Sequence, residues 1–305
     1  MNDVEGSTGV IYLAFGYGYC IQTVRSVLSL KSIHPELDVT IVTNMPLNGK
    51  LEDPVSYDGT KIGPRLFNEV VYIDDESSEN RQYKTSINKY SKYDKTLFLD
   101  CDTVIKRSIE QGFHFLDYFD FAAVSRPMPS PYLTERWGGD IHIPNIDIED
   151  SPTFYSGVFF FEAENTRSFF DKWNDSFNKL GYEYDQYSFA HSIYMENIRF
   201  LPLPIIWNTM NSDISRYTGF DDEYEFENRI KIHHQNRSGL QYRKSLCEID
   251  ALVGDEILDA GEKDRDEIRK RFRENYDFNY RDRVKRYLAK YSTVRKVHSK
   301  ISNAM

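Results

Sequence analysis

The sequence has few of the features that mark secreted or membrane-spanning proteins. Its three cysteines, Cys20, Cys101 and Cys247, are odd in number and lie far apart, so they offer neither a disulfide framework nor the ligand spacing of a zinc site. No apolar run approaches the roughly 18 residues that span a bilayer. Residues 1–9 are polar and acidic, without the basic and apolar stretches of a signal peptide. We therefore expect a soluble or peripheral protein in the reducing cytoplasm.

Internal repeats and low-complexity tracts are also missing, whereas apolar residues are plentiful. Of the 305 residues, 40% are hydrophobic and 15% are aromatic, which is enough for a packed core in one large or two small domains. Residues 281–305 carry eight Lys or Arg against one acid, and the whole chain carries −10, so the other 280 residues carry −17. A body this acidic argues against a nucleic-acid partner.

Strand and helix patterns alternate along the chain. Residues 9–15 and 37–44 are apolar runs typical of buried strands, and between them apolar residues recur at near-helical spacing over 21–30. Such a strand–helix–strand unit opens many nucleotide-binding sheets. Further strands are expected at 69–73, 97–105, 121–124, 155–161 and 229–234, helices at 81–93 and 166–180, and loops at 45–68 and 126–153. The predicted fold class is α/β, and the second loop, with its prolines and paired glycines, suits a cover over a site.

The most informative stretch is 96–105, where an apolar run ends in Asp100-Cys101-Asp102 and a second apolar run follows. The two aspartates lie two residues apart, so in extended backbone their side chains point the same way. Two unpaired carboxylates there would repel each other and be costly to bury, and a divalent cation removes that cost. Carboxylate ligands suit Mg²⁺ or Mn²⁺, although a bare Asp-x-Asp is more often a solvated turn.

Other motifs surround this pair in a definite order. They are the opening strand–helix–strand unit, the helix with Lys84, Tyr155-Ser156-Gly157-Val158, Tyr184-Asp185-Gln186, Pro204-Ile205-Ile206-Trp207-Asn208 and Ile232-His233. With these motifs, over roughly residues 9–240, the chain resembles the retaining nucleotide-sugar glycosyltransferases of family 8 and their relatives on the GT-A fold. The resemblance implies a Rossmann-like nucleotide-diphospho-sugar transferase fold. It also implies transfer from a UDP-sugar to a hydroxyl of a glycan or glycolipid, with retention.

The resemblance assigns roles to individual residues. Asp100, Asp102 and His233 match the family's ligands for Mn²⁺ (or Mg²⁺), while Asp185 and Gln186 match the pair beside the transferred sugar, where the catalytic groups are expected. The residues expected to contact the bound nucleotide sugar are Phe15, Gly16, Tyr17, Asn44, Lys84, Asp100, Cys101, Asp102, Ser156, Gly157 and Arg237.

Two details of this assignment stay open in the sequence. His233 and His234 are neighbours on an expected strand, so alternation turns one of them toward the metal and the other away without deciding which. The family's Lys-Pro-Trp segment after the late histidine is absent. Diphosphate contacts in this region are therefore expected from Arg237, Arg243 or Lys244.

Each residue also has a purely structural interpretation, and other functions fit part of the pattern. Lys84 alone fits a solvated helix lysine, Asp185 fits a helix N-cap, and Cys101 fits core packing. Asp100 and Asp102 also match the nucleophile and acid/base pair of haloacid-dehalogenase-like phosphohydrolases, with residues 254–259 as a later metal motif. In that family, however, the nucleophile ends the first strand of the domain. A non-catalytic nucleotide-sugar-binding protein is the third alternative.

We expect a GT-A domain at 1–255 and a helical, basic extension at 256–305. Within 281–305, apolar residues recur every three or four positions among the basic ones. This pattern is typical of a helix lying on an anionic membrane, and it fits equally well a helix packed on the acidic body. Membrane contact would place the protein at the inner face of the membrane, near a lipid-linked acceptor. No motif indicates an oligomeric state.

Overall fold

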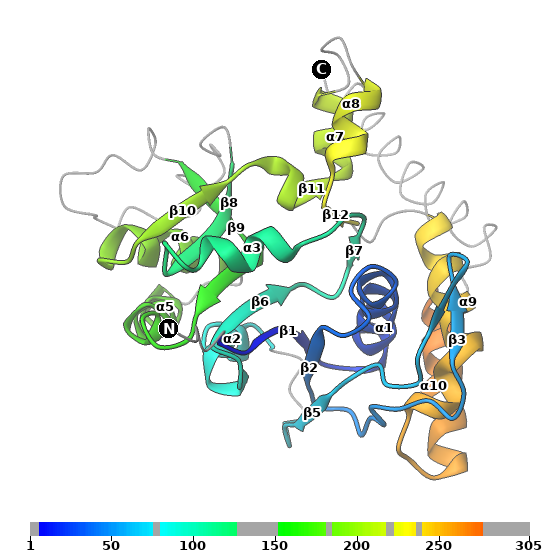
Figure 1. Ribbon diagram of the computed structural model, residues 1–305. Helices are drawn as coiled ribbons and strands as arrows, with labels where there is room; N and C mark the ends of the chain where they lie inside the picture. Colours follow the sequence, from blue (N-terminus) through cyan, green and yellow to red (C-terminus); the bar gives the residue numbers. More distant parts are fainter. Residues whose placement is uncertain are drawn as a thin grey trace, which may run out of the picture.

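A seven-stranded sheet forms the centre of the molecule (Figure 1). The computed structural model describes residues 6–75, 80–126, 152–180, 185–217, 223–235 and 240–276. The strands, in their spatial order, are β10 (Phe200–Leu203), β8 (Phe121–Arg126), β9 (Thr153–Glu162), β6 (Lys95–Leu99), β1 (Thr8–Ala14), β2 (Asp38–Thr43) and β5 (Glu69–Tyr72). Neighbouring strands are parallel except that β9 runs antiparallel to both β6 and β8. The predicted α/β class is confirmed.

Helices cover both faces of this sheet because alternate residues of its strands point to opposite sides. On one face, Val10 and Tyr12 of β1 belong to the buried cluster that includes α1 (Tyr17–Lys31) and α9 (Leu240–Ile257). On the other face, Ile11 and Leu13 join the aromatic cluster of α5 (Arg167–Leu180) and α6 (Asp185–Met195). Figure 1 shows α5 and α6 on one side and α1, α9 and α10 (Glu262–Tyr276) on the other.

A smaller sheet extends from the end of β6 and completes the framework of the site. It contains β7 (Thr103–Ile105), β12 (Ile232–His234) and β11 (Thr209–Met210), with β12 antiparallel to β7. Outside these two sheets lie the helices α2 (Arg81–Lys84), α3 (Glu110–Phe115), α7 (Asn211–Tyr217) and α8 (Glu223–Arg229), and the 3₁₀ turns η1 (Ile87–Tyr90) and η2 (Ile205–Trp207). The turn from β6 to β7 joins the large sheet to the small one, and this turn contains Asp100 and Asp102.

Two local expectations are corrected. Residues 45–68, expected as loop, contain the hairpin β3 (Val55–Tyr57) and β4 (Thr60–Ile62). Its turn has positive φ at both central residues, 48° at Asp58 and 77° at Gly59, and Asp-Gly is a preferred sequence for such a turn.

The single helix expected over 81–93 is instead α2 followed by η1. The interruption lies at Thr85, whose hydroxyl donates to the carbonyl of Gln82 and to Asn174 of α5. Side-chain bonds of this kind compete with a continuous helix.

The C-terminal expectations are only partly covered by the described residues. The expected boundary at residue 255 lies inside α9, and α10 follows it and packs against both α9 and α1. Among the helices that the structure describes, none combines the length and apolar character needed to cross a bilayer. The expected covering loop lies almost wholly outside the described residues, as does the basic segment 281–305.

Candidate metal and nucleotide site

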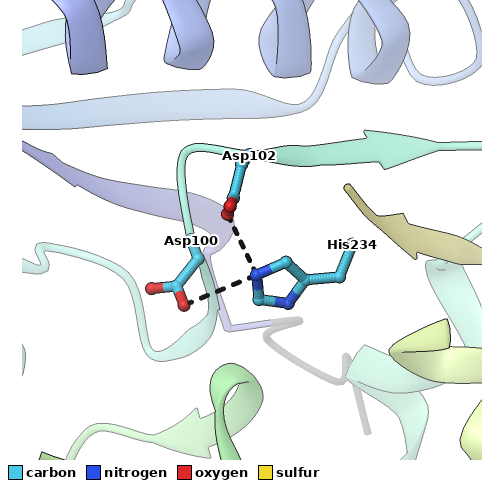
Figure 2. Close-up of side chains that lie close together, drawn as sticks. All are labelled: Asp100, Asp102 and His234. Carbon is cyan, nitrogen blue, oxygen red and sulfur yellow. Dashed lines mark ion pairs between the residues drawn. The ribbon is translucent and has the colours of Figure 1, made fainter. Parts of the chain in front are cut away.

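Three side chains converge where β6 passes into β7 (Figure 2). Nε2 of His234 lies 2.9 Å from Oδ1 of Asp102 and 4.0 Å from Oδ2 of Asp100. One ligand atom from each residue lies within 4.8 Å of the other two. The backbone holds this arrangement, because the N–H of Asp100 donates to the carbonyl of Gly157 and the N–H of Gln235 donates to the carbonyl of Asp102, both at 2.8 Å. Two carboxylates and one imidazole thus form a compact set of ligands.

The histidine in this group is His234, so the expected ligand His233 is corrected. In the antiparallel pairing of β12 with β7, His234 lies opposite Thr103, next to Asp102, and His233 lies opposite Val104. Nε2 of His233 instead contacts Oδ1 of Asn211 at 2.7 Å. Burial and then the positive charge of Lys106 lower the pKa of His233 to about 4.

A buried amide orients the imidazole of His234. Oδ1 of Asn208, at the end of η2, lies 3.0 Å from Nδ1 of His234, and Asn208 is fully buried. When Nδ1 carries the proton and donates it to Asn208, Nε2 presents its lone pair toward the two aspartates. This is the usual way in which an outer partner fixes a ligating histidine. Burial alone would lower the pKa of His234, but the hydrogen bond and charge of Asp102 raise it.

Gly157 leaves the space in which Asp100 and His234 meet. A Cβ atom at this position of β9 would lie 2.6 Å from Oδ2 of Asp100 and 2.7 Å from Cε1 of His234. Both distances are shorter than any normal contact of a Cβ atom. Gly157 was expected to contact the bound nucleotide sugar. The structure indicates a more specific role, because a side chain at residue 157 would displace Asp100 and His234, two of the three candidate metal ligands.

Lys84 connects this group to the start of α6. Its Nζ lies 2.9 Å from Oδ1 of Asp100 and 3.1 Å from Oδ2 of Asp185, and the lysine is buried. Burial would lower the pKa of Lys84, but the charges of Asp100 and Asp185 raise it overall. Burial would likewise raise the pKa of Asp185, yet the charge of Lys84 and a hydrogen bond from Ser156 hold it below its ordinary value. The structure therefore keeps a lysine cation and a carboxylate anion side by side.

The charges of this cluster fit a divalent cation. Asp100, Asp102 and Asp185 place three carboxylates close to Lys84 and the imidazole of His234. Carboxylates held this close repel one another. A divalent cation bound by Asp100, Asp102 and Nε2 of His234 would reduce that repulsion, and mixed oxygen and imidazole ligands suit Mn²⁺.

A pocket of about 450 Å³ opens beside the three ligands. Its lining consists of Leu13, Tyr19, Asn80, Arg81, Lys84, Phe98, Asp100, Cys101, Asp102, Asp185 and His234. Cys101 and Lys84 belong to the expected contacts, whereas Tyr19, Asn80 and Arg81 do not. Only Tyr19 had a sequence signal, since it belongs to the glycine-flanked start of α1.

Three expected contact residues, Phe15, Gly16 and Asn44, do not line the pocket. The ring of Phe15 is buried and lies 5.0 Å from that of Tyr83. Asn44 accepts the N–H of Gly16 at 2.8 Å, and its own amide donates to the carbonyl of Asp75 at 2.9 Å. Asn44 therefore holds the turn at Gly16, where φ is 84°, in place.

The other expected residues divide into three cases. Tyr17 points away from the pocket, because its hydroxyl donates to Oδ1 of Asp250 in α9 at 2.6 Å. Gln186 is half-buried beside Asp185 and does not line the pocket. Arg237 lies outside the described residues, and Lys244 pairs with Glu248 on the exposed side of α9.

The structure does not bring the later motif of the phosphohydrolase alternative into the group that contains Asp100 and Asp102. Asp255, in the later motif of that alternative, forms an ion pair with Arg269 of α10. The Asp100 group contains Asp102 and His234. Asp100 also follows β6 in the interior of the sheet, after β1, β2 and β5 in the chain, so it does not end a first strand.

Comparisons with known proteins bear on the fold. No protein-family model and no curated protein sequence matches the chain. The structure of galactosyltransferase LgtC in complex with donor and acceptor sugar analogues superposes with a TM-score of 0.51 at 12% identity, over 84% of this chain and 98% of that one. The chain has the GT-A fold. A likeness at this identity establishes architecture, and function has to be argued from the site.

Two other solved structures are less similar and add nothing to that conclusion. Mouse xyloside xylosyltransferase 1 gives a TM-score of 0.48 at 12% identity, over 75% of this chain and 98% of that one. The glycosyltransferase GlyE of Streptococcus pneumoniae gives 0.48 at 16% identity, over 79% of this chain and 60% of that one.

Proposed function

We propose that this protein is a metal-dependent glycosyltransferase that moves a sugar from a UDP-sugar to a hydroxyl of a glycan or lipid-linked acceptor, with retention. The observation that carries the proposal is the Asp100–Asp102–His234 group beside a pocket on a GT-A fold. In open α/β sheets, ligands bind at the carboxyl ends of the strands, and Asp100 directly follows the end of β6. UDP and retention rest on the family resemblance of the motifs.

Within this proposal, Asp100, Asp102 and His234 hold Mn²⁺ or Mg²⁺. The cation would supply charge neutralisation for the leaving diphosphate. Asp102 is the more enclosed aspartate, with 13% of its side chain exposed against 31% for Asp100. Asn208 orients the imidazole of His234, and Gly157 leaves the space in which the imidazole and the carboxylate of Asp100 meet.

Lys84 and Asp185 form the part of the site that faces the transferred sugar. Lys84 keeps Asp185 ionised through their 3.1 Å ion pair. Sugar transfer passes through a transition state with positive charge on the sugar ring, and a fixed carboxylate beside the ring would stabilise that charge. We assign this role to Asp185, and Gln186, on the same turn of α6, is the second candidate for contact with the sugar.

The first prediction tests the metal group. Wild-type protein should gain thermal stability from UDP or GDP when Mn²⁺ is present, because a ligand that binds the native state stabilises it by mass action. The variant Asp102→Asn should keep its fold and lose about tenfold or more in affinity for Mn²⁺ and for the nucleotide. Isothermal titration gives both affinities, and release of UDP from UDP-sugars gives turnover.

The matched control is Asp117→Asn, which removes an ion-paired aspartate of the same type from the turn after α3. Equal Mn²⁺-dependent nucleotide binding by Asp102→Asn and the control would refute the metal assignment. Tight binding without any turnover on a panel of UDP-sugars and acceptors would favour the non-catalytic binding protein. Trapping of beryllium fluoride at Asp100 would favour the phosphohydrolase.

A further inference from the structure

A buried polar contact ties the first turn of α1 to the C-terminal helices. The hydroxyl of Tyr17, the first residue of α1, donates to Oδ1 of Asp250 at 2.6 Å. Asp250 lies in the middle of α9 and is 0% exposed. The ring of Tyr17 packs edge-on against Phe272 of α10, with ring centroids 5.3 Å apart. Residue 17 therefore contacts two helices that lie more than 220 positions later in the chain.

Two arginines of α10 compensate the charge of Asp250. Nε of Arg269 donates to Oδ1 at 2.9 Å, and Nε of Arg273 donates to Oδ2 at 3.0 Å. Arg269 also donates to the backbone carbonyl of Asp250 and pairs with Asp255. A buried carboxylate with this many donors has one well-defined position, because every alternative leaves a charge unpaired.

The surrounding backbone leaves room for this contact. Gly254 lies one turn after Asp250 in α9, and a Cβ atom there would be 2.5 Å from Oδ1 of Asp250 and 2.8 Å from the hydroxyl of Tyr17. A glycine inside a helix costs about 1 kcal/mol relative to alanine. That cost is offset here by the space that the glycine leaves between three charged or polar groups.

The same turn of α1 forms part of the pocket wall. Tyr19 lines the pocket, and successive helix positions turn by about 100°, so side chains two residues apart point in nearly opposite directions. Tyr17 thus faces α9 and α10, while Tyr19 faces the pocket. The turn is held at its start by Asn44, which accepts the N–H of Gly16, and on its far side by Asp250.

We propose that Tyr17 and Asp250 are positioning residues of the nucleotide pocket, which set the first turn of α1 so that Tyr19 lines it. The helices α9 and α10 thereby support the donor site, although none of their described residues lines the pocket. The ligand in this inference, a nucleoside diphosphate, rests on the proposed function. The anchoring of the turn by Asp250 is independent of the proposed function, because it depends only on contacts within the protein.

The first test uses Tyr17→Phe, which removes the hydroxyl and keeps the ring packing on Phe272. Its matched control is Tyr93→Phe, because Tyr93 is also buried and its hydroxyl lies 2.9 Å from Oγ1 of Thr40, away from the pocket. Both variants should lose similar thermal stability. Only Tyr17→Phe should speed hydrogen exchange at the amides of Tyr19 and Cys20, which donate to the carbonyl of Gly16. This measurement needs no ligand.

The second test measures UDP affinity with Mn²⁺ present. Tyr17→Phe should weaken UDP binding about threefold to tenfold, which is less than the full effect of losing a hydrogen bond to a charged group, because the contact acts on the pocket only through the turn of α1. Tyr93→Phe should bind as wild type does. If Tyr17 acts through Tyr19, adding Tyr17→Phe to Tyr19→Ala should weaken binding no further. Affinity for Mn²⁺ alone should be unchanged in Tyr17→Phe.

The outcomes separate this inference from the proposed function. Unchanged exchange at Tyr19 and Cys20 in Tyr17→Phe overturns the anchoring, whatever the ligand. Faster exchange with unchanged UDP affinity, or additive effects in the double variant, overturns the link between the anchor and the pocket. Wild-type protein that binds neither UDP nor GDP overturns the proposed function and, with it, the pocket link, and the exchange measurement still decides the anchoring.

Discussion

At the scale of single residues, Gly157 decides how closely Asp100 and His234 approach each other. Replacement by alanine places a Cβ atom 2.6 Å from Oδ2 of Asp100. The carboxylate and the imidazole must then move apart, and such overpacking typically costs about 1–3 kcal/mol. We expect Gly157→Ala to fold and to bind Mn²⁺ about tenfold more weakly. Changes to residues that position the metal ligands typically alter metal affinity by about 10–100-fold.

A manganese titration followed by electron paramagnetic resonance measures this loss. The matched control is Gly63→Ala, since a Cβ atom at Gly63 would meet nothing within 4 Å. Manganese affinity in Gly157→Ala equal to that of the control would show that the ligands adjust without cost.

Residue-scale outcomes also show where sequence reasoning ends. Asp100 and Asp102 could be predicted as neighbouring carboxylates at the end of a strand, because their spacing and the preceding apolar run are visible in the sequence. The choice between His233 and His234 could not, because it depends on the register of β12 against β7. In the same way, the glycine break marked the start of α1, but only the packing of α9 and α10 shows that Tyr17 faces them while Tyr19 faces the pocket.

At the scale of elements, one ion pair joins the starts of β8 and β10. Asp120 accepts the N–H of Arg199 at 2.9 Å and its Nε at 3.1 Å, and the N–H of Asp120 donates to the carbonyl of Arg199 at 2.8 Å. The hydrogen bonds from Arg199 lower the pKa of Asp120. Asp120→Asn should therefore reduce the free energy of unfolding at neutral pH by about 1 kcal/mol, below the usual range for hydrogen bonds to charged groups, because the Arg199 side chain is 61% exposed and water screens the pair.

The pH dependence of this effect has a definite sign. A carboxyl group whose pKa is lower in the folded state stabilises the fold above its unfolded pKa, and this contribution is lost as pH falls through the folded pKa. The difference between wild type and Asp120→Asn should be complete above about pH 5 and shrink below the ordinary aspartate pKa of about 3.9. Urea unfolding at several pH values measures it. A constant difference down to pH 3 would contradict the assignment, and the exposed pair of Asp117 should contribute less than about 1 kcal/mol.

Elements with a one-sided pattern could be predicted well, and those set by tertiary contacts could not. The helix expected at 166–180 is α5 at Arg167–Leu180, because Phe169, Phe170 and Trp173 mark its buried side. The prediction of one helix over 81–93 was wrong, because the helix is interrupted at Thr85. The hydroxyl of Thr85 bonds to Asn174, which is distant in the chain. The run in β9 showed a buried strand, but its antiparallel direction depends on β6 and β8.

At the scale of the whole molecule, the uneven charge is the strongest feature outside the site. Residues 281–305 carry +7 and the rest of the chain carries −17. This segment lies outside the described residues, and its role remains a prediction from sequence. An acidic body is repelled by an anionic membrane within the Debye length, about 8 Å at physiological salt. A basic segment with an apolar stripe would reverse that repulsion locally, since each basic residue near the surface contributes about 1 kcal/mol.

We therefore expect full-length protein to bind vesicles of mixed neutral and anionic phospholipids, with binding that falls as salt rises. Truncation after Tyr280 should abolish vesicle binding and leave Mn²⁺-dependent nucleotide binding intact, because the described site lies within residues 13–234. Replacing Tyr287 and Leu288 with serine keeps the charge and tests the apolar stripe separately. Sedimentation with vesicles measures all three proteins. If full-length protein never sediments and truncation lowers the melting temperature, the segment packs on the body, and placement at the inner face of the membrane is wrong.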